Sequence, residues 1–128
     1  MGKIMLDSSV LIALMDSRDA HHEAVVSRLG KGSDHYEISA IALMETLIAP
    51  FAATPNMGEK IREELLDFFR VIHPVSEEVA VAAARIRART QLKVPDALIS
   101  ATAILAGAQL WTLDKKLAKA HKGALLVA

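Results

Sequence analysis

Short apolar runs alternate along the chain with longer segments whose apolar residues recur every three or four positions. Apolar runs bounded by turn residues are typical of buried strands, and the longer segments are typical of helices. Their alternation indicates an α/β protein with a parallel sheet covered on both faces. We expect strands at residues 3–6, 35–39, 70–75, 109–113 and 124–127, and helices at 8–15, 18–32, 40–52, 58–69, 77–90 and from Pro95 onward.

Polar and helix-breaking residues predict where these helices begin and end. Serine before an apolar-periodic segment accepts a hydrogen bond from the first turn and so caps the helix. The expected caps are Ser8 or Ser9, Ser39 and Ser76. Pro50 is expected to kink or end its helix, and residues 54–56 are expected to form a loop.

Composition narrows the class of protein. The chain has 128 residues, of which 52% are hydrophobic, and this fits a single folded domain over residues 1–128. Its formal net charge is zero, which argues against a strongly basic nucleic-acid binder but allows a local basic patch. The absence of cysteine excludes disulfides and thiolate metal sites. No segment reads as a signal peptide or a membrane span, so we expect a cytoplasmic protein.

Four acidic residues occupy positions that a parallel sheet would bring together. Asp7 follows the first predicted strand, and Asp114 follows the fourth. Asp96 lies at the start of a helix, and Glu45 lies one to two turns into the helix after the second strand. Ligands of open parallel α/β sheets bind beyond the carboxyl ends of the strands, so these acids are candidate catalytic residues.

Clustered carboxylates repel one another unless a proton or a cation intervenes. Oxygen ligands without thiolates suit Mg²⁺ or Mn²⁺, so the sequence predicts a metal site at this edge of the sheet. The hydroxyls of Ser9 and Thr112, close to Asp7 and Asp114, are candidates for orienting a carboxylate or a water. Taken singly, Asp7 has an ordinary alternative as a helix cap, and Asp96 has one as a first-turn acid favoured by the helix dipole.

Three segments in this order resemble the PIN-domain family: "MLDSSVLIALM", the glutamate of "SAIALMETL", and "VPDALISATAILAGAQLWTLD". They are most similar to the VapC-type toxins of toxin–antitoxin modules, and the resemblance covers nearly the whole chain. It implies a three-layer α/β/α fold with a short central parallel sheet of four to five strands. It also implies a Mg²⁺- or Mn²⁺-dependent endoribonuclease.

The resemblance carries over to individual residues. The acids of the family match Asp7, Glu45, Asp96 and Asp114 as catalytic residues, and its helper hydroxyls match Ser9 and Thr112. We expect Asp7, Asp96 and Asp114 to hold the metal. Some members carry a further acid after the last aspartate, where this chain has Lys115 and Lys116, so the number of ions, one or two, stays open.

The resemblance also implies two protein partners, a second copy of the chain and an antitoxin. Residues 42–53 are more apolar than one buried face requires. We expect this segment either in the core or in a groove for the dimer mate or an antitoxin helix.

Two basic stretches are candidates for contacts with RNA phosphates. One contains Arg85, Arg87, Arg89 and Lys93, and the other contains Lys115, Lys116, Lys119, His121 and Lys122. Solvated helix faces explain both stretches equally well. Trp111 lies in a predicted strand and is expected in the core.

Three other function classes share the α/β pattern. A haloacid-dehalogenase-type phosphatase needs a second aspartate two residues after the first, where this chain has Ser9. A receiver-type signalling domain needs a phosphoacceptor aspartate after the third strand, where Ser76, Glu77 and Glu78 follow instead. The remaining alternative is a PIN-like fold kept for binding RNA or a partner without catalysis, and the intact acidic set argues against it.

Overall fold

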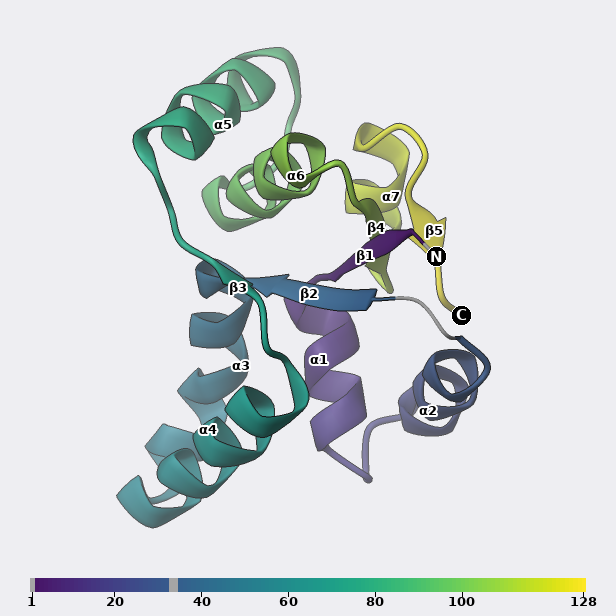
Figure 1. Cartoon of the computed structure of the whole chain (residues 1–128), viewed down its shortest axis with the longest axis vertical. Coiled ribbons are helices and arrows are strands. Elements are labelled where there is room, and N and C mark those ends of the chain that lie inside the picture. Colours follow the sequence, from purple (N-terminus) through teal and green to yellow (C-terminus); the bar gives the residue numbers. More distant parts are fainter. Residues whose placement is uncertain (1, 33–34) are drawn as a thin grey trace.

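The computed structural model describes residues 2–32 and 35–128. Its centre is a parallel sheet of five strands in the order β3-β2-β1-β4-β5 (Figure 1). The register pairs Met5 of β1 with Glu37 of β2 and with Leu110 of β4, so β1 occupies the middle of the sheet. The strands are β1 (Lys3–Leu6), β2 (His35–Ser39), β3 (Ile72–His73), β4 (Gln109–Thr112) and β5 (Leu125–Leu126).

Helices cover both faces of this sheet. The helices are α1 (Ser8–Met15), α2 (His22–Gly30), α3 (Ala40–Ala53), α4 (Pro55–Phe68), α5 (Glu77–Arg89), α6 (Val94–Ala106) and α7 (Lys115–Ala120). Figure 1 shows α1 to α4 on one side of the sheet and α5 and α6 on the other. The predicted three-layer α/β/α fold with a short parallel sheet is therefore confirmed.

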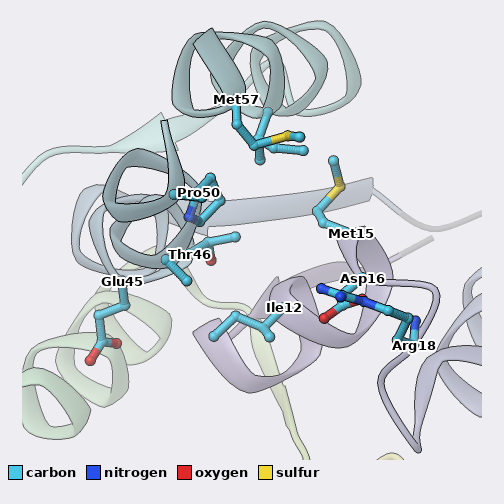
Figure 2. Close-up of a pocket in the computed structure, with 11 residues that line it drawn as sticks. Ile12, Met15, Asp16, Arg18, Glu45, Thr46, Pro50 and Met57 are labelled. Carbon is cyan, nitrogen blue, oxygen red and sulfur yellow. The ribbon is translucent and has the colours of Figure 1, made fainter. Parts of the chain in front are cut away.

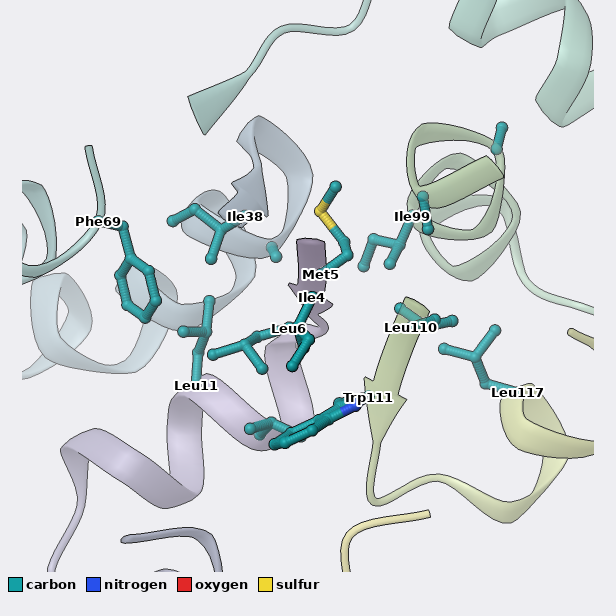
Figure 3. Close-up of a cluster of buried hydrophobic side chains, with 14 of the residues drawn as sticks. Ile4, Met5, Leu6, Leu11, Ile38, Phe69, Ile99, Leu110, Trp111 and Leu117 are labelled. Atoms are coloured by element: carbon teal, nitrogen blue, oxygen red, sulfur yellow. The ribbon is translucent and has the colours of Figure 1, made fainter. Parts of the chain in front are cut away.

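The core lies on both faces of β1 because successive strand residues point to opposite sides. Met5 points toward Ile99 of α6, and Leu6 lies on the side of Leu11 and Phe69 (Figure 3). All five side chains are at most 1% exposed. Trp111 is 6% exposed, which confirms its expected place in the core.

The helix starts agree with the sequence at two of the three expected caps. The hydroxyls of Ser39 and Ser76 accept from the Ala42 and Val79 amides, as predicted. The cap of α1 is Asp7, not Ser8 or Ser9, so that prediction is wrong. The carboxylate of Asp7 reaches the first turn because the residue leaves β1 in an extended conformation.

Helix α3 ends within one residue of its expected end, and the helix after it starts earlier than expected. Pro50 lies inside α3, which continues to Ala53, so Pro50 does not end this helix. The expected loop at residues 54–56 is absent. Thr54 caps α4 by accepting from the Met57 amide at 3.0 Å, and Pro55 takes the first helical position, where its missing N–H costs nothing.

Three other boundaries differ. Helix α2 begins at His22, because the carboxylates of Asp16 and Asp19 bind backbone amides two residues ahead and hold turns there instead. Strand β3 is shorter than residues 70–75. Helix α7 was not predicted.

In the part of the chain that the structure describes, no helix is long and apolar enough to cross a membrane.

Candidate active site

The carboxyl edge of the sheet collects the predicted acids. Asp7 directly follows β1, and Asp114 follows β4 after one intervening residue. Glu45 lies in the second turn of α3, the helix that leaves β2, and Asp96 lies in the first turn of α6. Each acid therefore sits at or near a helix N-terminus. The helices α1, α3 and α7 each follow a strand, whereas α6 follows α5 and leads into β4.

Asp7 is the buried member of the group, with 3% of its surface exposed. Its Oδ1 accepts from the Ser9 hydroxyl at 2.6 Å and from the Val10 amide at 3.0 Å, and its Oδ2 accepts from the Thr112 hydroxyl. Burial raises the pKa of Asp7 above its ordinary value, and these hydrogen bonds oppose the rise. The charge of Asp114 adds to the increase in this pKa.

The hydroxyls of Ser9 and Thr112 connect Asp7 to the chain beyond β4. The Ser9 hydroxyl accepts from the Leu113 amide at 3.0 Å while donating to Asp7. The Thr112 hydroxyl accepts from the Asp114 amide at 2.9 Å while also donating to Asp7. The predicted supporting hydroxyls therefore touch a site carboxylate and hold it in one orientation.

Glu45 is half-buried, and its Oε1 accepts from the Ser8 hydroxyl at 2.8 Å. Figure 2 shows its carboxylate directed away from Pro50 and Met57, toward the pale green ribbon of α6. Sequence reasoning missed this role of Ser8, which was expected as a cap. The only signal in the sequence was that Ser8 lies next to Asp7. This position does not reveal that Ser8 bonds to Glu45, 37 positions away.

Asp96 is half-buried, and no hydrogen bond to its side chain is found among the described residues. Burial is the largest cause that raises the pKa of its carboxyl. Three negative charges raise this pKa further, those of Asp114, Glu45 and Asp7, while Lys93 lowers it. The charges of the other three acids therefore lie near enough to act on the Asp96 carboxyl.

Asp114 caps α7. Its Oδ1 accepts from the amides of Lys116 at 2.9 Å and Leu117 at 3.4 Å. Its Oδ2 has no hydrogen bond to another described residue and is free to bind a ligand. Of the ordinary alternatives, the one for Asp7 is observed, since Asp7 caps α1, and Asp96 lies in the first turn of α6.

The donor chemistry of this cluster fits a hard cation. All four candidates offer carboxylate oxygens, and their mutual repulsion is what a bound cation would relieve. Among residues 2–32 and 35–128, no three Asp, Glu or His side chains are placed to hold one ion together. Mg²⁺ is commonly bound by one or two carboxylates while keeping several waters, so the donor chemistry agrees with this ion although the side chains do not provide three ligands together. The ligand set of Asp7, Asp96 and Asp114 stays a prediction.

The candidate RNA-binding residues lie in two separate places. Lys115 and Lys116 are exposed in the first turn of α7, directly after Asp114, and so border the acids. Arg85 and Arg87 are exposed on α5, which packs on α6. No described contact joins these two arginines to the four acids.

Comparison with known proteins gives one matching family and a consistent set of folds. A model of the PIN domain family matches residues 4–123. A toxin–antitoxin complex from Klebsiella pneumoniae has a chain 27% identical, with a TM-score of 0.80 and 98% of both chains covered. FitAcB from Neisseria gonorrhoeae is 25% identical, with a TM-score of 0.79 and 95% of both chains covered.

A more distant relative shares the fold. A Mycobacterium tuberculosis protein described as a sarcin–ricin loop cleaving toxin is 18% identical, with a TM-score of 0.80 and coverage of 96% of this chain and 97% of that one. No curated protein matches the chain. The fold and the family rest on these matches, and the acids described above lie within the matched residues.

Proposed function

The chain belongs to the PIN-domain family, and on that premise we propose that it is a metal-dependent endoribonuclease acting as the toxin of a type II toxin–antitoxin pair. The observation that carries this proposal is the convergence of Asp7, Glu45 and Asp114 on the carboxyl of Asp96. A structural role alone gives no reason to gather four acids at one edge, since like charges there destabilise the fold.

The ion would be Mg²⁺ or Mn²⁺. Asp7, Asp96 and Asp114 would hold it once their side chains move closer together or waters bridge them to the ion, because no three acids among the described residues are placed to hold one ion directly. When bound, such an ion supplies an activated water and stabilises the leaving oxygen of a phosphodiester. The Ser9 and Thr112 hydroxyls keep the Asp7 carboxylate oriented before any ligand arrives.

Glu45 has a different task from the aspartates. The Ser8 hydroxyl holds its Oε1, and its Oε2 has no hydrogen bond to another described residue. This free oxygen can accept a proton from a water, which is the role of a general base. Lys115 and Lys116, and further away Arg85 and Arg87, would contact the phosphates of the RNA.

A cleavage assay tests this proposal. The purified chain should cut single-stranded RNA with Mg²⁺ or Mn²⁺ and stop when a chelator is added. Asp96→Asn and Glu45→Gln should each lower the rate at least about a hundred-fold, as expected for residues that place or activate the nucleophile. Glu64→Gln removes the same charge from an exposed position on α4 and should leave the rate unchanged.

Two outcomes would overturn the proposal. One is cleavage that persists in excess chelator after contaminating ribonuclease is excluded. The other is full activity of Asp96→Asn. A chain that binds RNA but never cleaves it under any divalent ion would instead favour the non-catalytic binding module.

The antitoxin is proposed from the relatives and from a groove beside the acids. The relatives from Klebsiella pneumoniae and Neisseria gonorrhoeae were solved as toxin–antitoxin and FitAcB assemblies. In this chain a groove of about 310 Å³ lies between α1, α3 and α4, lined by apolar residues that include Ile12, Met15 and Met57. Figure 2 shows these side chains around the opening, and Glu45 lies at its border. An apolar helix bound here would lie next to the carboxylates.

A homodimer is proposed from the opposite side of α3. Met44, Ile48 and Phe51 are 49%, 60% and 40% exposed and do not line the groove. Their spacing of four and three residues places them on one face of the helix. An apolar stripe of this kind fits a second copy of the chain.

A further inference from the structure

A second pocket lies between α5, α6 and α7, lined by residues other than the four acids. It has a volume of about 460 Å³, within the range of small-ligand sites. Ser100 of α6 and His121, which ends α7, form one wall. Arg89 of α5 and Lys122 contribute the charged side chains. No acidic residue lines it, so its charge is positive.

The wall contains a buried pair of polar side chains. Ser100 and His121 are 3% and 7% exposed, and the Ser100 Oγ lies 2.6 Å from the His121 Nδ1. The Ser100 hydroxyl has no other partner in the described part of the chain, so we assign its hydrogen to this bond. The Nδ1 then accepts, and the ring proton resides on Nε2. Burial lowers the pKa of His121, which keeps the ring neutral near pH 7.

We assign the Nε2 proton to the pocket, because His121 is one of the residues that line it. Within residues 2–32 and 35–128, every buried side-chain nitrogen or oxygen has a hydrogen-bond partner, and no partner of this Nε2 is found. The atom is therefore accessible, and the pocket that His121 lines is where it opens. The pocket thus presents a fixed N–H donor from a rigid, buried pair.

The two cations complete the donor set. The Nε of Arg89 donates to the Arg85 carbonyl at 3.3 Å, which holds the side chain and leaves the terminal guanidinium nitrogens unused. Neither Arg89 nor Lys122 forms an ion pair with another described residue. We infer that this pocket binds a phosphate group, through the His121 Nε2 proton, the Arg89 guanidinium and the Lys122 ammonium.

Phosphate fits these donors better than a carboxylate does. A guanidinium takes two oxygens of one oxyanion, and the ammonium and imidazole donors need further oxygens that a planar carboxylate lacks. The phosphate has two sources, a free phosphate compound or the backbone of RNA. The second is within reach because Ser100 lies one helical turn, about 6 Å, beyond Asp96 on α6, and His121 ends the helix that Asp114 begins.

The test uses the His121 ring as the reporter. The full chain is labelled for NMR and kept in chelator without divalent ions. It is titrated with inorganic phosphate and, separately, with a four-nucleotide oligouridylate. We expect a saturable shift of the His121 ring resonances. Arg89→Gln and Lys122→Gln should each raise the Kd for phosphate about ten-fold, equivalent to about 1.4 kcal/mol.

Lys60→Gln is the matched control, because it removes the same charge as Lys122→Gln from an exposed residue of α4 outside the pocket. Its Kd for inorganic phosphate should stay within two-fold of the parent. A response to phosphate alone identifies a site for free phosphate compounds, and a response to both identifies one that also accepts the RNA backbone. No shift with either, or equal weakening by Lys60→Gln, overturns the inference. No cleavage is scored, so failure here leaves the proposed nuclease untouched.

Discussion

Asp96 differs from its three acidic neighbours because no other residue in the described part of the chain donates a hydrogen bond to its carboxylate. Serine and threonine hydroxyls bind Asp7, a serine hydroxyl binds Glu45, and backbone amides bind Asp114. Burial and the neighbouring negative charges therefore raise the pKa of Asp96, and no hydrogen bond from a described residue opposes this increase. At neutral pH its negative charge lowers the stability of the metal-free protein.

Asp96→Asn should consequently abolish cleavage and leave the metal-free protein as stable as the parent, or more stable. The gain should be a few tenths to about 1 kcal/mol, since solvent screens a half-buried carboxyl. Because the pKa of Asp96 is raised in the folded state, its negative charge destabilises the folded protein at pH values above that pKa. The gain should therefore fade as the pH falls toward 3.8, the ordinary aspartate value. Denaturant melts in chelator between pH 3 and pH 7 would measure it.

Asp114→Ala is the contrasting variant. It also removes a site carboxylate, but it deletes the cap of α7 and should cost about 1 kcal/mol. Destabilisation by both variants to the same extent would show that Asp96 is only a dipole-favoured first-turn acid.

Single residues of the site could be predicted where the chain itself marks the strand ends. Asp7 and Asp114 follow apolar runs, so their shared edge could be read without coordinates. The bond from Ser8 to Glu45 could not, because it depends on how α1 and α3 cross. For the same reason, the contact between Ser100 and His121 could not be read from the sequence, although His121 lies in one of the two basic stretches.

At the scale of elements, α3 and α4 meet where Gly58 faces the ring of Phe51. A Cβ added at Gly58 would lie 2.1 Å from the Phe51 Cδ1 and 2.3 Å from its Cγ. The whole ring would have to move, which costs more than a shift of a side-chain tip. Glycine itself is unfavourable inside a helix by about 1 kcal/mol relative to alanine.

These opposing effects predict that Gly58→Ala lowers the free energy of unfolding when Phe51 is present and raises it when Phe51 is replaced by alanine. Gly58→Ala alone should lower the free energy of unfolding by about 1 kcal/mol or more, because overpacking exceeds the gain in helix propensity. In a Phe51→Ala background the same change should raise it by about 0.5–1 kcal/mol. Thermal melts of the four proteins form a double-mutant cycle. Equal effects of Gly58→Ala in both backgrounds would exclude the contact as the cause.

Element boundaries were harder to predict than element types. The start of α4 carried a readable signal, a threonine followed by a proline at the first helical position. Helix α7 has only six residues, too few for a periodic pattern, although Asp114 offered the cap. Strand β3 ends before Pro74, which has no N–H to give to a neighbouring strand.

At the scale of the whole molecule, the exposed stripe on α3 predicts self-association. Ile48→Glu should raise the dimer dissociation constant at least about ten-fold, because it places a charge at the centre of the stripe. Val26→Glu makes the same change at a 44%-exposed position on α2 and should leave the dimer intact. Light scattering over a concentration series measures both. A monomeric parent at high micromolar concentration would contradict the prediction.

The hydrogen bond between Asp7 and Thr112 joins residues 105 positions apart. During synthesis on the ribosome, Asp7 is therefore made well before Thr112 and Asp114. A growing polypeptide lacks the site until β4 has emerged and has docked beside β1. The order of translation itself keeps an unfinished chain from assembling the acidic cluster inside the cell that makes it.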